Sequence, residues 1–130
     1  MTTALYASIL SILMCWLSMN VIKSRRKNKV KYADGDCQEL KIARSAQSNA
    51  VDYIPITLIL LFALEYNGGH IWLLHIIGIT FVMARIIHCR SILADQLRGR
   101  ILGMKITFAV IVMLAILNLI YLPYPKILAV

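Results

Sequence analysis

Residues 4–22 read ALYASILSILMCWLSMNVI and contain no charged side chain. A bilayer core about 30 Å thick is crossed by about 20 apolar residues in an α-helix, so this stretch is long enough to span a membrane once. A cleaved signal peptide is the competing interpretation. The stretch has no Lys or Arg before it, exceeds the length of a signal-peptide core, and lacks a small-x-small cleavage site. These features favour a membrane helix.

Three further apolar windows follow, and 60% of the 130 residues are hydrophobic, with a mean hydropathy of +0.75. A soluble domain of this length is far more polar. We therefore predict an all-α integral membrane protein, a four-transmembrane-helix bundle in a single domain over residues 1–130. The expected helices cover residues 4–22, 38–64, 71–92 and 100–122.

Local features predict where these helices begin and end. Asp36-Cys37-Gln38-Glu39 has the spacing of a capping box, with Asp36 as the cap, which predicts that the second helix begins near residue 38. Asn67-Gly68-Gly69 predicts a tight turn between the second and third helices. Pro55 falls inside the second helix, where a membrane helix tolerates it. Pro123 and Pro125 are expected to end the fourth.

The positive charge is gathered at one end of the predicted bundle. By the positive-inside rule, the first and third connections are cytoplasmic, and both termini and the turn at residues 67–69 lie outside. The basic run 23–31 lacks the interleaved aromatics of a nucleic-acid site, so we predict no nucleic-acid partner, although anionic lipid headgroups would be attracted. Thirteen of the fourteen Lys and Arg residues lie near these two connections, and only Lys126 does not: Lys23, Arg25, Arg26, Lys27, Lys29, Lys31, Lys41, Arg44, Arg85, Arg90, Arg98, Arg100 and Lys105.

The cysteines and histidines show no metal-ligand spacing. Cys15, Cys37 and Cys89 form no Cys-x-x-Cys motif, and the three histidines are scattered without a nearby carboxylate. We therefore predict neither a metal site nor a structural disulfide.

Ionisable and amide side chains inside a membrane span are costly and commonly mark function. Ser45, Asn49 and Asp52 are spaced to form one stripe on the second helix, with Gln47 and Ser48 beside it, and Arg85 and His88 share a face of the third. One interpretation is a buried Asp52–Arg85 ion pair that only orients helices. The alternative is a binding site for a small peptide, because Arg binds carboxylates, amides bind peptide groups, and Asp binds an ammonium.

At these residues the chain resembles the MAPEG family, the membrane-associated proteins of eicosanoid and glutathione metabolism, and especially its small bacterial inner-membrane members. The segment Asn49-Ala50-Val51-Asp52-Tyr53-Ile54-Pro55 is similar to the family's N-x-x-E-x-x-P on the second helix. Arg85-x-x-His88 and the segment Arg100-Ile101-Leu102-Gly103-Met104 also fall in the family's order. The resemblance covers nearly the whole chain.

The resemblance implies a homotrimer in the inner membrane, with glutathione bound between adjacent subunits near the cytoplasmic side. Arg100 matches an arginine that stabilises the glutathione thiolate, and Arg25 falls close to a second functional arginine, so both are expected to be catalytic. The residues that the resemblance assigns to glutathione binding are Arg44, Gln47, Asn49, Asp52, Tyr53, Arg85, His88 and Arg100.

Three positions depart from the family's pattern. Ser45 stands where glutathione-using members carry arginine, and Arg44 is one position earlier. Asp52 replaces a glutamate that is one methylene longer. Ile92 stands where several members have a ligand-contacting tyrosine. Each change is expected to weaken glutathione binding.

Three functions compete. The first is a glutathione-dependent transferase or peroxidase, in which glutathione is the co-substrate and the second substrate is a lipophilic electrophile or lipid hydroperoxide from the membrane. The second is a non-catalytic scaffold on the same fold that binds lipid or thiol. The third is a small multidrug transporter, which the absence of any acidic residue in the first helix disfavours.

Overall fold

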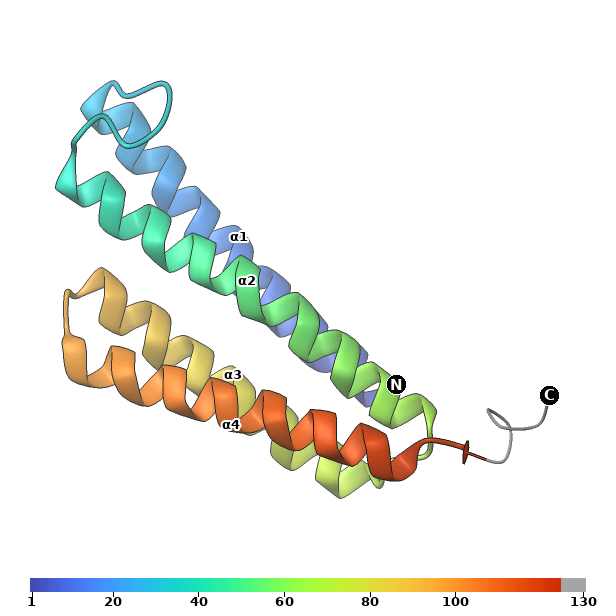
Figure 1. The fold of residues 1–130 in the computed structure, drawn as a ribbon. Coiled ribbons are helices and arrows are strands. Elements are labelled where there is room, and N and C mark those ends of the chain that lie inside the picture. The colour runs from blue at the N-terminus through green and yellow to red at the C-terminus, as the bar shows by residue number, and fades with distance from the viewer. Residues whose placement is uncertain (125–130) are drawn as a thin grey trace.

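The computed structural model describes residues 1–124 as a bundle of four helices that alternate in direction (Figure 1). They are α1 (Thr2–Asn28), α2 (Gln38–Tyr66), α3 (Ile71–Leu93) and α4 (Leu97–Tyr121). Each is long enough and apolar enough to cross a membrane, as expected from the sequence. The α1–α2 loop and the α3–α4 connection lie at one end, which we call the basic end.

The first helix is longer than its apolar window predicts. It continues to Asn28, through Arg25, Arg26 and Lys27, and stops at Lys29, which adopts a left-handed conformation with φ 55°. Cations in the last turn of a helix interact favourably with the negative end of the helix dipole, so the basic run stays helical. The fourth helix likewise begins earlier than expected, at Leu97 rather than at residue 100.

The predicted capping box is wrong. The cap of α2 is Cys37, which makes no side-chain capping bond, and Asp36 adopts a left-handed conformation with φ 55°. Both carboxylates pair with lysines instead: Asp36 accepts from Lys41 at 3.2 Å and Glu39 from Lys27 at 2.9 Å. In this basic loop the nearby ammonium groups compete successfully with the backbone N–H groups.

The proline and turn positions predicted from the sequence agree with the structure. Pro55 lies inside an uninterrupted α2, and Gly68 makes the α2–α3 turn with φ 86°, a conformation that favours glycine. Helix α4 ends at Tyr121, just before Pro123. Pro125 and Lys126 lie outside the described residues. Cys15, Cys37 and Cys89 are free thiols.

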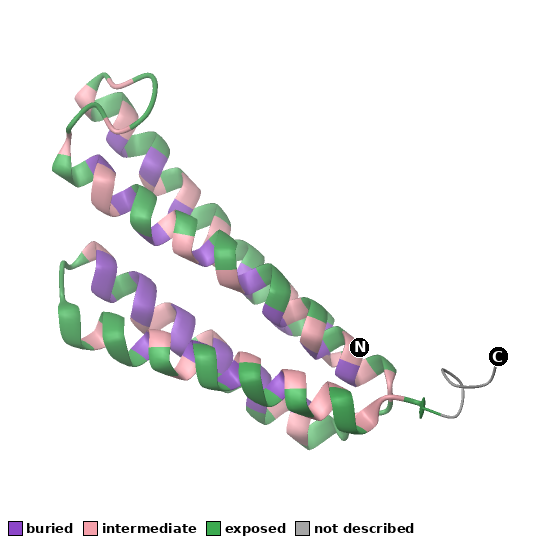
Figure 2. Ribbon diagram, in the orientation of Figure 1, coloured by how far each residue is buried: buried purple, intermediate pink, exposed green. Residues whose placement is uncertain are grey.

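The buried residues lie along the sides of the helices that face their neighbours (Figure 2). Helix α3 has the largest buried share. Helix α3 contacts the other three helices, while apolar residues such as Ile59, Trp72 and Val112 point outwards, as expected for a surface in contact with lipid. At Gly78 the α1–α3 contact is so close that a Cβ atom would overlap the ring of Tyr6. Tyr6 also bonds to His75, with 2.7 Å between Oη and Nδ1. Small residues at such contacts let membrane helices approach closely.

We therefore expect Gly78→Ala to lower the free energy of unfolding by about 1–3 kcal/mol, because the added methyl group has to displace the buried ring of Tyr6. Thermal unfolding in detergent micelles measures the change. Ile79→Ala, at the exposed neighbouring position, is the control and should leave the midpoint nearly unchanged. Equal midpoints for the wild type and Gly78→Ala would show that the contact is looser than the structure indicates.

Candidate functional site

A completely buried arginine lies in the half of the bundle that is nearer the basic end, which we call the basic half. Arg85 lies on α3 at 0% exposure, and its Nη2 donates to Oδ1 of Asn49 on α2 at 2.7 Å. Its Nη1 lies 3.5 Å from Oγ1 of Thr107 on α4, and its Nε has no hydrogen-bond partner. The Tyr53 ring lies 6.0 Å from the guanidinium carbon. The side chain of Arg85 on α3 therefore contacts both α2 and α4.

The expected Asp52–Arg85 ion pair is wrong. Asp52 is exposed, and no ion pair within residues 1–124 includes Arg85. Asp52 comes three positions after Asn49, so the two side chains differ in direction by about 60° around the helix. Asn49 therefore reaches the guanidinium, whereas the side chain of Asp52 stays exposed.

Arg85 also determines how Asn49 is oriented. Because a guanidinium only donates hydrogen bonds, Asn49 must present its oxygen to Arg85 and its amide nitrogen away from it. That nitrogen lies 4.0 Å from the sulfur of Met104, a weak contact that leaves it available to an acceptor. The guanidinium hydrogen-bonds only to neutral groups, and no described carboxylate forms an ion pair with it.

Next to Asn49 an open groove of about 860 Å³ lies between α2, the end of α3 and the start of α4. This volume lies within the range of small-molecule sites in proteins. Five residues that the resemblance assigned to glutathione binding line it together: Arg44, Gln47, Asn49, Asp52 and Arg100. Ser45 and Ile92, which like Asp52 depart from the family's pattern, line it as well.

The remaining predicted site residues do not line this groove. Arg85 and His88 are buried behind it, and Tyr53 packs edge-to-face against Phe108 with ring centroids 5.5 Å apart. Arg25 lies near the end of α1, where its Nη1 donates to the carbonyl of Lys31 at 3.4 Å. Its catalytic role stays a prediction. Among residues 1–124, no cluster of three His, Cys, Asp or Glu side chains is arranged to hold a metal ion.

Two charged lining residues were missed by the sequence analysis. Lys41 is four residues before Ser45, so the helical stripe already pointed to it. Asp34 had no such pattern, because it comes from the α1–α2 loop, which turns back through left-handed residues at Ala33, Gly35 and Asp36. Together with Asp52, Arg44 and Arg100, they give the groove three cations and two carboxylates.

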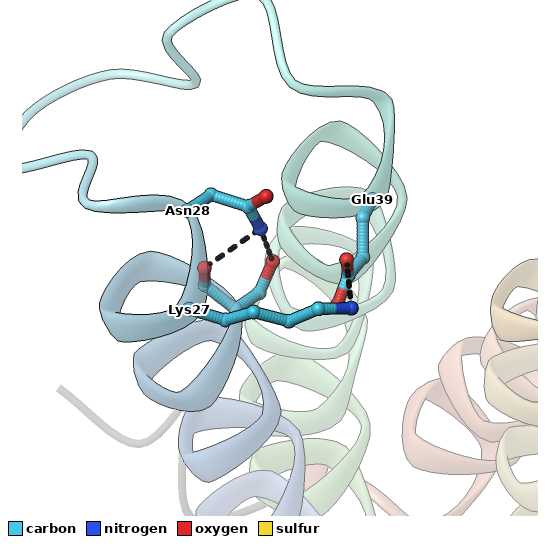
Figure 3. Close-up of polar contacts among 4 residues, drawn as sticks. Lys27, Asn28 and Glu39 are labelled. Atoms are coloured by element: carbon cyan, nitrogen blue, oxygen red, sulfur yellow. Dashed lines mark hydrogen bonds and ion pairs between the residues drawn. The ribbon is translucent and has the colours of Figure 1, made fainter.

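The α1–α2 loop that carries Asp34 begins and ends at two polar contacts (Figure 3). Lys27 on α1 reaches across to Glu39 on α2, and the bond from its ammonium group lowers the pKa of the Glu39 carboxyl. Asn28 turns back and donates to the carbonyl of Ser24 at 2.9 Å. The Lys27–Glu39 contact joins the two helix ends on either side of the loop, whereas the Asn28 bond lies within the last turn of α1.

A comparison with known protein families shows which family the chain belongs to. Residues 3–120 match the MAPEG family, and the chain is a membrane protein that belongs to it. It is similar to the inner membrane protein YecN of Escherichia coli strain K12, with 35% identity over 124 residues that make up 95% of each chain. The protein of the same name from E. coli O6:H1 strain CFT073 matches equally well.

The Arg85–Asn49 contact gives a test of the site's construction. Asn49→Leu should lower the free energy of unfolding by roughly 1–3 kcal/mol or more, because it leaves a buried guanidinium without its shortest hydrogen bond. Asn49→Asp should preserve stability, since its carboxylate can accept from the same Nη2. Denaturation in detergent compares the two variants with the wild type. Equal destabilisation by both would contradict the assigned contact.

Proposed function

We propose that the groove binds glutathione, or a low-molecular-weight thiol of the same chemistry, and holds it as a thiolate. The main support is that one groove is lined by five side chains whose chemistry suits a small acidic peptide. Arg44 and Lys41 can donate to the carboxylates of such a peptide. Asn49 and Gln47 can bond to its peptide groups, and Asp52 can accept from its ammonium group. Gln47 already donates to Oγ of Ser18 at 3.2 Å, so its amide oxygen is the free group.

In this proposal Arg100 stabilises the thiolate. A guanidinium beside a thiol lowers the thiol pKa and raises the fraction of the nucleophilic form at neutral pH. With an electrophile, the sulfur forms a bond to carbon as the leaving group departs. With a lipid hydroperoxide, the sulfur takes the terminal oxygen and releases an alcohol, and a second glutathione then gives the disulfide and water.

The membrane setting supports a lipophilic second substrate. The groove lies at the basic end of four apolar helices, so a substrate dissolved in the bilayer can approach it from the side. We place the protein in the inner membrane, as the name of its E. coli relative suggests. We further propose that the basic end faces the cytoplasm, that both termini face the periplasm, and that three subunits assemble so that neighbours complete each groove.

One observation favours a second candidate, a non-catalytic scaffold that binds lipid or thiol. Ser45 and Ile92 line the groove where glutathione-using relatives are expected to carry an arginine and a tyrosine. The loss of a charge and a hydroxyl would weaken ligand binding more than it would affect the fold.

Turnover by the purified protein separates the two candidates. Arg100→Ala should lower kcat by roughly 10²–10³-fold, the usual effect of removing a group that stabilises developing negative charge. Arg98→Ala is the matched control, because Arg98 is also exposed at the start of α4 but does not line the groove. The assay uses glutathione with a panel of electrophiles and hydroperoxides. A wild-type protein that binds glutathione but turns over none of them would favour the scaffold.

A further inference from the structure

We propose that His88 is a positioning residue, whose buried imidazole holds the backbone of Arg100 and so determines where its guanidinium meets the thiol. This inference rests on the proposed role of Arg100. It replaces the expectation that His88 contacts the ligand, because His88 is 2% exposed and does not line the groove.

The hydrogen bond determines which nitrogen of His88 carries a proton. Nδ1 of His88 lies 2.8 Å from the carbonyl oxygen of Arg100. A carbonyl oxygen only accepts, so Nδ1 must donate, and the neutral ring then carries its lone pair on Nε2. Nε2 is buried and makes no hydrogen bond. The bond to Arg100 is therefore the ring's one polar contact.

The start of α4 needs such a contact. Its cap, Gln96, makes no side-chain bond, and no acidic residue occupies the first turn. Arg98 and Arg100 instead place positive charge near the positive end of the helix dipole, which is unfavourable. A helix that begins in this way tends to fray. The bond from His88 holds the first turn against α3.

Two glycines allow this bond to form. Gly99 and Gly103 lie one turn apart and flank Arg100 on the face of α4 that meets α3. A Cβ atom on Gly103 would lie 2.7 Å from Cβ of His88 and 2.8 Å from the carbonyl oxygen of Ala84. A Cβ atom on Gly99 would collide with Oγ of Ser91. The close approach of the two backbones brings Arg100 within reach of the imidazole.

The same face of α3 thus connects to both walls of the groove. Arg85 bonds to Asn49 on α2, and His88, three residues later, bonds to Arg100 on α4. Both side chains are buried, and neither lines the groove. Helix α3 therefore determines the separation of Asn49 and Arg100, which we propose as the donors for a peptide group and for the sulfur of the thiol ligand.

The test compares three substitutions that differ in where they place a donor. His88→Asn keeps an amide nitrogen near the position of Nδ1, His88→Gln moves it outward to the position of Nε2, and His88→Leu has none. The thiol pKa of bound glutathione is measured from the ultraviolet absorbance of the thiolate. We expect His88→Asn to leave this pKa unchanged, whereas His88→Gln and His88→Leu raise it. We also expect Gln and Leu to lower kcat by about 10- to 100-fold with little change in KM, as for a misplaced catalytic group.

A second variant and a second readout keep the inference separate from protein stability and from the proposed function. Gly103→Ala leaves His88 intact but forces α4 away from α3, so it should reproduce the effect of His88→Gln. Hydrogen–deuterium exchange of residues 100–104, whose N–H groups bond to the carbonyls of the cap and first turn, needs no glutathione. This exchange should accelerate in the His88→Gln, His88→Leu and Gly103→Ala proteins but not in His88→Asn.

The outcomes are distinct. Wild-type exchange and thiol pKa in His88→Gln would overturn the positioning role. The absence of a thiolate signal in the wild type would overturn the proposed function, and the exchange data would still decide whether His88 holds the first turn of α4.

Discussion

The basic half of the bundle depends on the contact between Arg85 and Asn49. A charged side chain inside a membrane protein is costly unless its donors are satisfied, and Arg85 is fully buried with an amide oxygen at 2.7 Å and a hydroxyl at 3.5 Å. These two partners belong to α2 and α4, so both helices have to stay close to α3. The charge itself has no carboxylate partner among the described residues, which leaves positive potential behind the groove.

The two ends of the bundle differ in how closely the helices are held together. At the end opposite the loop, Glu65 on α2 accepts from the backbone N–H groups of Thr2 and Thr3, and Tyr6 bonds to His75 on α3. These contacts join α1 to its neighbours. At the basic end, the pair α1–α2 diverges from the pair α3–α4 (Figure 1). The groove is lined there by α2, Ile92 of α3 and Arg100 of α4. The contacts at the Glu65 end thus hold α1, α2 and α3 together, while the groove at the basic end stays accessible.

The sequence predicted features that depend on local patterns. Apolar length predicted the four helices, Gly68 predicted the turn, and helical spacing predicted that Asn49 and Asp52 lie along one groove. Features that depend on competing partners were not predictable. The carboxylates of Asp36 and Glu39 form ion pairs with lysines instead of capping the backbone of α2. Arg85 bonds to the amide of Asn49 and not to Asp52. The bond from His88 to a backbone carbonyl leaves no trace in the sequence, because any residue supplies a carbonyl.

A glutathione titration followed by NMR tests the central claim, that the groove between α2 and the start of α4 is the thiol site. Selective labelling reports the side-chain amide of Asn49, the guanidinium of Arg100 and, at the opposite end, the imidazole of His75. The account predicts saturable shifts at Asn49 and Arg100 and none at His75. Saturable shifts confined to the end that contains His75, or no shifts at Asn49 and Arg100 with glutathione in excess, would contradict it.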